Sequence, residues 1–243
     1  MVESASKSPV AIVTGAGGGI GTAICIELAK AGYHISLVGR SETSLQATVN
    51  EIAVCSGNMA QTLVVPADLS DHHQITNIVQ TTYQHWDKID VLINNAAACP
   101  NFPIDQTTIQ ELQGAFALNY FAPALLVAEL WPIFVQQDFG CVINISSIAT
   151  VDPFPGLSMY AASKSAMESL TRSIINEASE ADITSYSIAP GAVETSMLRS
   201  LISVDDLPTD KTLNPATVAS VVLDCVLGRR KSDNGKTIVL EKA

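Results

Sequence analysis

Tyr160 and Lys164, four residues apart, are the side chains of this sequence best suited to proton transfer. Residues i and i+4 lie on one face of a helix, so a helix here would place them together. A phenol with a pKa of about 10 is a poor base near neutral pH. An ammonium one turn away favours the phenolate and lowers that pKa towards the range in which a general acid or base works best. The spacing predicts an acid–base centre, although a surface Tyr–Lys pair has the same spacing.

A glycine-rich run from Thr14 to Gly21 follows a short apolar segment and precedes a helical pattern. Glycines let the backbone approach a phosphate, and the N-terminus of the helix supplies free N–H groups and a positive dipole. Gly15, Gly19 and Gly21 have the spacing Gly-x-x-x-Gly-x-Gly instead of the common Gly-x-Gly-x-x-Gly. A flexible turn is the alternative, but the position after the first predicted strand favours a dinucleotide cradle.

Apolar runs alternate with helical patterns along the whole chain. Strands are predicted at 9–13, 35–38, 63–65, 91–93, 142–145, 184–188 and 237–240, and helices at 20–31, 42–54, 74–85, 107–136, 158–179 and after Pro215. Within 107–136, Pro123 and Pro132 predict a bend or a break. Strands that are apolar throughout are typical of a parallel sheet covered on both faces. We therefore predict an α/β fold with a doubly wound, Rossmann-type parallel sheet of about seven strands.

The domain prediction is one dinucleotide-binding and catalytic domain over residues 1–243, since no linker or repeat interrupts the pattern. Residues 196–214, called the lid segment below, form the one long stretch outside the predicted sheet. A segment that follows a strand end in an open α/β sheet could lie over the ligand crevice, so we expect it to be a substrate lid.

Composition and charge limit the partners. The net charge of −11 repels phosphate backbones and anionic membranes, so we expect neither nucleic acid nor membrane as a partner. Only 15% of the residues are charged, which predicts that part of the surface is buried against another subunit. Five widely spaced cysteines predict free, buried thiols and a reducing compartment. The polar stretch from Met1 to Pro9 has no apolar signal core, and no uninterrupted apolar run approaches the about 20 residues of a membrane span, so we expect a cytoplasmic protein.

With these motifs in this order, the sequence resembles the classical short-chain dehydrogenases/reductases over nearly its whole length. The resemblance rests on Thr14-Gly15-x-x-x-Gly19-x-Gly21, Asp68-Leu69-Ser70, Asn94-Asn95-Ala96, Tyr160-Ala161-Ala162-Ser163-Lys164 and Pro190-Gly191-Ala192-Val193-Glu194-Thr195. Asn119 and Ser147 stand where this family has its active-site asparagine and serine. The resemblance implies reversible hydride transfer between a nicotinamide and a ketone, an aldehyde or a secondary alcohol.

The resemblance also implies roles for individual residues. The implied catalytic residues are Asn119, Ser147, Tyr160 and Lys164: Tyr160 exchanges the proton, Ser147 steadies the substrate oxygen, and Asn119 completes a water relay to Lys164. The implied cofactor-binding residues are Thr14, Gly15, Gly17, Gly18, Gly19, Ile20, Gly21, Gly39, Arg40, Ser41, Asp68, Leu69, Asn95, Ala96, Ala97, Tyr160, Lys164, Pro190, Gly191, Val193 and Thr195. Ser146, beside Ser147, is interpreted as a strand-end hydroxyl satisfied by the backbone.

The residues at the end of the second predicted strand indicate which nicotinamide cofactor is preferred. An acidic residue there would accept the ribose hydroxyls of NAD, but Gly39 stands at that place and Arg40 follows. A guanidinium suits a 2′-phosphate because it donates in a planar fork. We hypothesise NADP(H), with Arg40 and Ser41 on the phosphate, and rank NAD(H) second; a solvated arginine is the alternative. Gly18 stands where some NADP-using members of the family carry a second basic residue.

The substrate side is apolar. Candidate pocket residues are Ala98, Cys99, Phe102, Phe154, Leu157, Met197, Leu198 and Leu201, which suit a hydrophobic or mid-sized neutral carbonyl compound, although they could also merely pack the lid segment. Ala97 replaces a glycine of the family's Asn-Asn-Ala-Gly, which requires a negative φ there. The four histidines do not form a site, and we predict no metal.

Two other functions stay open at this point: a catalytically silent NADP(H)-sensing binding protein, and a redox-neutral epimerase or lyase on the same fold. Association is also expected. Ala161, Ala162, Ser165, Ala166 and Ser169 give the Tyr160 helix small side chains. The family usually forms homodimers or homotetramers through such helices, so the resemblance implies one of these.

Overall fold

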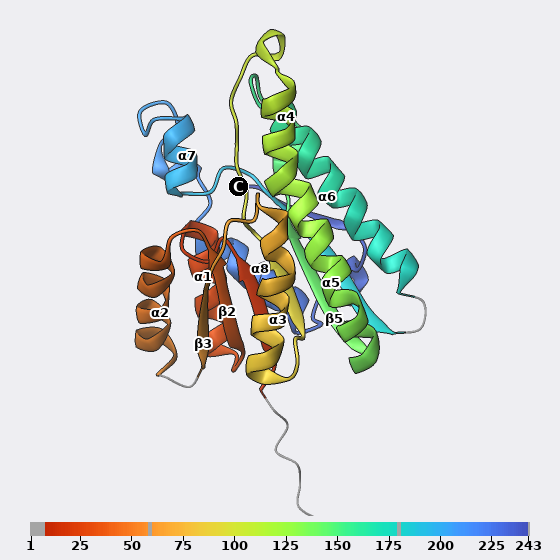
Figure 1. Cartoon of the computed structure of the whole chain (residues 1–243). Helices are drawn as coiled ribbons and strands as arrows, with labels where there is room; N and C mark the ends of the chain where they lie inside the picture. Colours follow the sequence, from red (N-terminus) through yellow and green to blue (C-terminus); the bar gives the residue numbers. More distant parts are fainter. Residues whose placement is uncertain (1–7, 58–59, 179–180, 243) are drawn as a thin grey trace, which may run out of the picture.

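The computed structural model of the chain describes residues 8–57, 60–178 and 181–242. Most of the polar N-terminal stretch, Ser179 and Ala243 therefore lie outside the described residues. Seven strands form one sheet in the order β3-β2-β1-β4-β5-β6-β7, and every neighbouring pair is parallel (Figure 1). They are β1 (Val10–Thr14), β2 (His34–Gly39), β3 (Thr62–Pro66), β4 (Val91–Asn94), β5 (Phe139–Ile145), β6 (Asp182–Pro190) and β7 (Thr237–Leu240). The predicted doubly wound sheet is confirmed.

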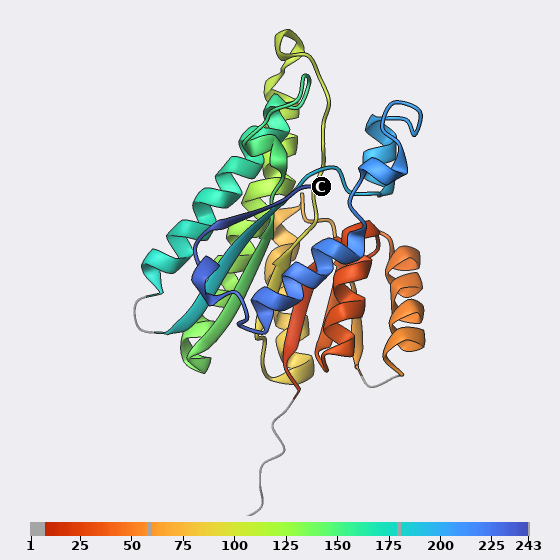
Figure 2. The same ribbon diagram turned by 180° about the vertical axis from the view of Figure 1, so that it is seen from behind.

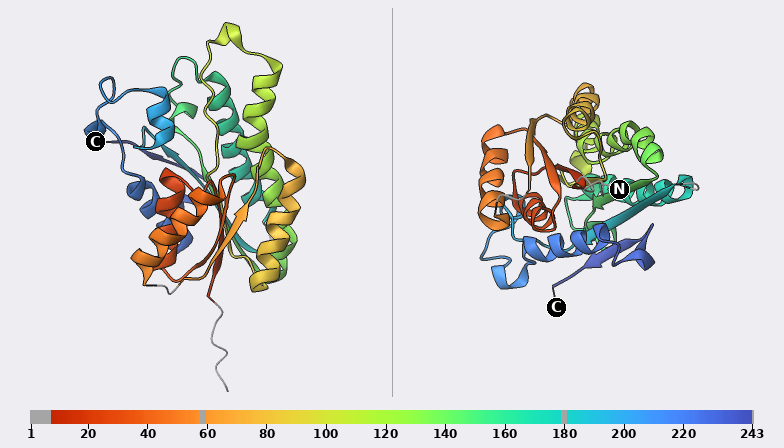
Figure 3. Two further views of the ribbon diagram at one scale, coloured as in Figure 1. Left: turned by 60° about the vertical axis from the view of Figure 1, so that its left-hand side comes forward. Right: turned by 90° about the horizontal axis from the view of Figure 1, so that it is seen from below.

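Helices cover both faces of the sheet (Figures 1 and 2, and the right-hand view of Figure 3). One layer holds α1 (Gly19–Lys30), α2 (Glu42–Ser56) and α8 (Pro215–Val226); the other holds α3 (Ile75–Trp86), α4 (Ile109–Phe116), α5 (Ala122–Gln137) and α6 (Ser158–Glu177). The strands supply apolar side chains to both layers: Val13 and Ile35 face the α1 side, whereas Ile12 and Leu92 face the α3 side. This two-sided burial explains why the central strands read as continuous apolar runs.

The long helix predicted over 107–136 is interrupted, but not by its prolines. A π-helical turn, Ala117–Phe121, separates α4 from α5 and contains the buried Asn119. Pro123 lies in the first turn of α5, where a missing N–H costs no helix bond, and α5 continues through Pro132. The predicted break at a proline is therefore wrong, and the helix is interrupted at Asn119 instead.

An 18-residue window of the continuous stretch Ile109–Gln137 has a mean hydropathy of 1.5, so by length and composition alone this stretch could cross a membrane. Several of its apolar side chains are buried in the core of this fold, however. Leu126, Leu130 and Phe134 are fully buried in the core on the α3 side of the sheet. A core helix of a soluble protein has the same composition, so this stretch carries no argument for a membrane.

The sheet reverses its winding between β1 and β4, which are neighbours in the sheet although two strands separate them along the chain. In such sheets the crevice beyond the carboxyl ends at this point receives the ligand. The turn after β1, the loop after β4 and the residues that follow β5 and β6 all lie at that edge. Above it stands α7 (Ser196–Leu201), the helix of the lid segment (Figure 3, left).

Candidate active site

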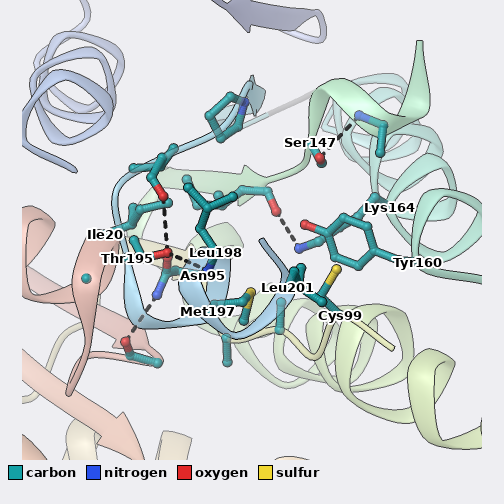
Figure 4. A pocket seen from close by; sticks show the side chains of 18 of the residues that line it. Ile20, Asn95, Cys99, Ser147, Tyr160, Lys164, Thr195, Met197, Leu198 and Leu201 are labelled. Atoms are coloured by element: carbon teal, nitrogen blue, oxygen red, sulfur yellow. Dashed lines mark hydrogen bonds between the residues drawn. The ribbon is translucent and has the colours of Figure 1, made fainter. Parts of the chain in front are cut away.

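A cavity of about 520 Å³ opens at the carboxyl edge of the sheet (Figure 4). Its lining includes Arg40 and Asp68, which follow β2 and β3, and Met197 and Leu201 of α7. Most of the predicted cofactor-binding residues line it: Gly15, Gly18, Gly19, Ile20, Gly39, Arg40, Asp68, Leu69, Asn95, Ala96, Ala97, Tyr160, Lys164, Pro190, Gly191, Val193 and Thr195. Thr14, Gly17, Gly21, Ser41 and Asn119 are not among its lining residues.

The glycine turn is as tight as a phosphate cradle requires. Gly15 and Gly19 have φ values of 64° and 40°, which side chains with a Cβ rarely adopt. A Cβ on Gly21 would lie 2.1 Å from the Gly15 carbonyl oxygen, so the first turn of α1 packs directly on the loop. No described side chain caps the N-terminus of α1, and its Gly18 borders the cavity. These features fit a pyrophosphate held by backbone N–H groups.

Two polar side chains brace this turn from beneath. The Thr14 hydroxyl donates to the Ile93 carbonyl (3.1 Å) and accepts from the Asn95 amide N–H (2.9 Å). The Asn95 side chain in turn donates to the carbonyls of Thr14 and Gly15, at 2.9 and 3.1 Å. Thr14 therefore positions the cradle without lining it. Ala97 is not among the described residues with positive φ, so the condition for accepting its methyl group is met.

Arg40 and Asp68 line the cavity where β2 and β3 end. The Asp68 carboxylate accepts from the Ser70 backbone N–H (2.9 Å) and hydroxyl (2.7 Å). These bonds, with the Arg40 charge, lower the pKa of Asp68. Ser41 caps α2, because its hydroxyl accepts from the Ser44 N–H at 3.2 Å. Arg40 is thus the cation at the place where the sequence predicts a 2′-phosphate.

Tyr160 and Ser147 come together in the middle of the cavity (Figure 4). Both side chains line the cavity, and the Ser147 hydroxyl accepts from the Ala149 N–H at 3.2 Å. Burial raises the pKa of Tyr160 above its ordinary value of 10, and the nearby Ser147 hydroxyl opposes that rise only in part. The phenol consequently keeps its proton at neutral pH. A hydroxyl pair of this kind can bind and protonate one oxygen atom.

Lys164 is fully buried one helical turn beyond Tyr160. Its ammonium donates to the Ile145 carbonyl (2.6 Å) and lies 5.8 Å from the centre of the Tyr160 ring. Desolvation lowers the pKa of Lys164 from 10.5 to about 8. The expected lowering of the Tyr160 pKa by this ammonium is not found, because burial dominates the shift and Lys164 does not contribute to it. Spacing on a helix placed the two residues together, but it carries no information about desolvation.

Asn119 bridges the loop after β4 and helix α6. Its amide nitrogen donates to the Ala98 carbonyl and the Ser163 hydroxyl, both at 2.9 Å, and its oxygen accepts from the Ala98 N–H at 2.9 Å. Both side-chain N–H groups are therefore used by protein atoms. The water relay to Lys164 stays a prediction, and the bonds that are present show how Asn119 positions the residue that precedes Lys164.

Ser146 departs from its prediction. Its hydroxyl donates to the Glu168 carboxylate (2.7 Å) and not to the backbone, and Thr150 donates to the same oxygen (2.9 Å). Glu168 therefore holds the segment on both sides of Ser147 against α6. The sequence offered no signal for this contact, because the carboxylate lies 22 residues away along the chain.

The substrate end of the cavity is largely as predicted. Of the eight candidate residues, Cys99, Phe154, Leu157, Met197, Leu198 and Leu201 line it, whereas Ala98 and Phe102 do not. Cys99 lies beside Tyr160 (Figure 4), and burial raises the pKa of its thiol to about 11. Cys25, Cys141 and Cys225 are buried as predicted, whereas Cys55 is exposed.

Thr195 is the last residue of the motif that begins at Pro190. Its hydroxyl caps α7 by accepting from the Leu198 N–H (3.2 Å), and it donates to the Val193 carbonyl (3.2 Å). The neighbouring Glu194 forms an ion pair with Arg199. The sequence does not predict this pair, because a separation of five residues is no regular helical spacing.

Comparison with known proteins fits this arrangement. The short chain dehydrogenase family model matches residues 9–205. A fatty acyl-CoA reductase of Acinetobacter baylyi is 31% identical over 227 residues, which cover 93% of this chain and 75% of that protein. A levodione reductase structure is similar, with a TM-score of 0.89, 25% identity and 96% of each chain covered.

The fold is also shared with an actinorhodin polyketide ketoreductase variant solved with NADPH. Its TM-score is 0.89 at 22% identity, with 97% of this chain and 96% of that chain covered. The family match spans both the glycine turn and the pair of Tyr160 and Lys164. The chain belongs to the short-chain dehydrogenase/reductase family of oxidoreductases.

Proposed function

We propose that this protein is an NADP(H)-dependent reductase of uncharged, apolar ketones or aldehydes, able to run in reverse on secondary alcohols. The observation that carries the proposal is that one cavity is lined both by the glycine turn and by the side chains of Ser147 and Tyr160. A site for a dinucleotide and a site for a reacting oxygen thus adjoin each other.

A nicotinamide cofactor, when bound, supplies or accepts the hydride. In the proposal its pyrophosphate lies on the turn from Gly15 to Gly21, where a Cβ at Gly15, Gly19 or Gly21 would collide with neighbouring atoms. Lys164 and Thr195 face the same cavity and are the residues that would hold its nicotinamide half. The rest of the chemistry belongs to side chains of this chain.

Tyr160 acts as the proton donor in carbonyl reduction. Its pKa lies above the ordinary value, so the phenol is protonated at neutral pH and can give its proton to a developing alkoxide. Ser147 donates a second hydrogen bond to that oxygen and so stabilises the charge as it builds. Two of the similar proteins are named reductases, which supports this direction.

Arg40 supports NADP(H) over NAD(H). It borders the cavity directly after β2, where no carboxylate stands to accept ribose hydroxyls. Asp68, the nearby carboxylate, is engaged by Ser70. The Ser41 hydroxyl accepts from the Ser44 N–H and remains able to donate its own proton to a phosphate.

The apolar substrate class follows from the cavity walls. Among the described residues that line it, the charged ones are Arg40, Asp68 and Lys164. Arg40 and Asp68 lie at the cofactor end, and Lys164 is bonded to Ile145. The apolar lining residues include Leu157, Phe154, Met197, Leu198 and Leu201, and Asn101 is an uncharged polar one. Such a pocket binds uncharged carbonyl compounds and offers no partner for a carboxylate.

We also propose that the chain forms a homodimer or homotetramer. Ala162, Ser165 and Ser169 are exposed on α6, and Phe121 and Leu125, 43% and 39% exposed, lie on the neighbouring helical stretch that ends in α5. Small side chains beside exposed apolar ones suit close helix packing between copies. Sedimentation as a single 25.7 kDa species would contradict this proposal.

The activity is tested by following oxidation of NADPH and of NADH, separately, with a panel of cyclic and aliphatic ketones, aldehydes and quinones. Turnover with NADPH that a Y160F variant lacks would support the whole proposal. Equal or better use of NADH would remove the NADP(H) preference. Turnover of keto acids in preference to neutral ketones would contradict the substrate class.

A further inference from the structure

Backbone hydrogen bonds hold the two ends of the lid segment together. Leu213 at its end pairs in parallel with Val193 before its start: the Leu213 N–H donates to the Ala192 carbonyl (2.7 Å), and the Glu194 N–H donates to the Leu213 carbonyl (2.9 Å). Both ends of the segment are thus fixed at one point, directly after β6. What lies between them can move only as a loop closed at this base.

Arg199, on α7, connects that base to the far part of the loop. Its Nε donates to Glu194 Oε1 at 2.7 Å, and a second guanidinium nitrogen pairs with Glu194 Oε2. Its Nη1 donates to the carbonyls of Ser203 (3.1 Å) and Leu207 (2.8 Å). One side chain therefore joins the start of the loop, its helix and its outer turn.

Glu194 also bonds the C-terminal end of the lid segment. The carboxylate oxygen that pairs with Arg199 also accepts from the Thr212 hydroxyl at 3.0 Å. The hydrogen bond from Arg199 is the main cause that lowers the pKa of Glu194 to about 2, so the carboxylate stays ionised at neutral pH. The Arg199 and Glu194 side chains are only 18% and 32% exposed, so the pair is screened less by water than a surface pair.

The part of the loop held in this way faces the cavity. Met197, Leu198 and Leu201 come from α7, a helix of six residues that is too short to be stable without tertiary support. Leu207, whose carbonyl bonds Arg199, also lines the cavity. The orientation of this apolar wall thus depends on the Arg199 side chain.

We propose that Arg199 and Glu194 are positioning residues for substrate binding, which hold the apolar face of the lid segment over the cavity. The proposal rests on the proposed reductase function for its substrate and goes beyond it, because neither residue touches the reacting atoms. The planar fork of arginine is needed, since it bonds a carboxylate and two carbonyls at once.

The test compares R199M with R229M. Arg229 forms an exposed pair with Asp224, with 63% and 35% of the two side chains exposed and neither residue lining the cavity, so it is a matched control. Steady-state kinetics with a neutral ketone and hydrogen exchange over residues 196–211 are measured for both variants. We expect R199M to raise KM by about tenfold with kcat changed less than about threefold, and to exchange faster only in that segment. R229M should match the natural chain in both measurements.

Unchanged exchange in R199M would overturn the proposal, as would faster exchange with an unchanged KM. If R199M does not fold, E194Q carries the same test, because it keeps the size of the side chain and removes its charge. A natural chain that reduces no ketone would instead refute the proposed function. That failure appears as missing turnover of ketones. If instead the clamp, that is the ion pair of Arg199 and Glu194, does not hold the lid segment, the failure appears in hydrogen exchange, so the two failures are distinguishable.

Discussion

Lys164 directs its ammonium at the carbonyl oxygen of Ile145, 2.6 Å away, and not at the hydroxyl of Tyr160. The contact joins helix α6 to the end of β5 inside a fully buried environment. A single carbonyl is a poor substitute for the water that a free ammonium binds, which is why the pKa of Lys164 falls to about 8.

The first prediction concerns stability and pH. Because the folded pKa of Lys164 lies below its ordinary value of 10.5, the unfolded chain binds more protons between pH about 8 and 10.5. The contribution of Lys164 to the free energy of unfolding therefore rises with pH across that window. In K164M this contribution is absent. The difference in unfolding free energy, natural chain minus K164M, should grow from pH 8 to pH 10 in urea titrations.

Only the difference between the two proteins is informative here. Burial raises the pKa of Cys25, Cys141 and Cys225, so their thiols destabilise the folded state over part of the same range. Those thiols are common to both proteins and cancel in the subtraction. A difference that stays constant with pH would show that Lys164 is not desolvated as described.

The second prediction concerns the proton donor. Replacing Tyr160 with phenylalanine removes the hydroxyl beside Ser147 and leaves the ring in place. We expect Y160F to lose roughly a hundredfold to ten-thousandfold in kcat, the usual contribution of a general acid. NADPH affinity, measured by fluorescence, should change less than about threefold. If both activity and cofactor affinity are lost, Tyr160 has a structural role instead.

The third prediction concerns cofactor preference. Replacing Arg40 with alanine should weaken NADPH binding by about tenfold or more and leave NADH binding nearly unchanged, because only NADPH carries the 2′-phosphate. Conversely, G18R should strengthen NADPH binding. A Cβ on Gly18 meets no described atom within 4 Å, and the residue has extended backbone (φ −161°), so the new side chain is accommodated. Fluorescence titration of both cofactors checks each variant, and parallel changes for NADH would contradict the assignment.

The sequence was informative wherever a short apolar run or a fixed spacing decides the structure. Val91 to Asn94 is wholly buried, so its strand was visible as an apolar run, and the glycine turn was visible from its place after β1. The break at Asn119 was harder to place, because prolines are the stronger local signal. Pro123 does not break the helix, since it lies in the first turn of α5, where its missing N–H costs no helix hydrogen bond.

Properties that depend on surrounding atoms could not be predicted in the same way. The spacing of Tyr160 and Lys164 put them on one helix, but their pKa shifts come from burial by segments that are distant in sequence. The clamp between Glu194 and Arg199 links a loop to a short helix across five residues, a spacing that no regular element favours. Such contacts follow from tertiary packing, which local patterns do not encode.

The fourth prediction is that alanine is tolerated at Gly18 but not at Gly21 of the same turn. A Cβ on Gly21 would lie 2.1 Å from the Gly15 carbonyl oxygen and 2.8 Å from the Asn95 side chain, so G21A must push α1 away from the loop. Asn95 also donates to the Thr14 carbonyl, so displacing its side chain disturbs the hydrogen bonds that hold the glycine turn. We expect G21A to lose thermal stability by several degrees, consistent with an overpacking cost of about 1–3 kcal/mol.

G18A is the matched control, since the same methyl group at Gly18 meets no described atom within 4 Å. Its melting temperature should stay within about two degrees of the natural chain, because an open site imposes no strain. NADPH should raise the melting temperature of the natural chain and fail to raise that of G21A, since the cradle is then distorted. If both variants melt alike, close packing in the turn does not set the shape of the site, and the fit to a pyrophosphate loses its structural basis.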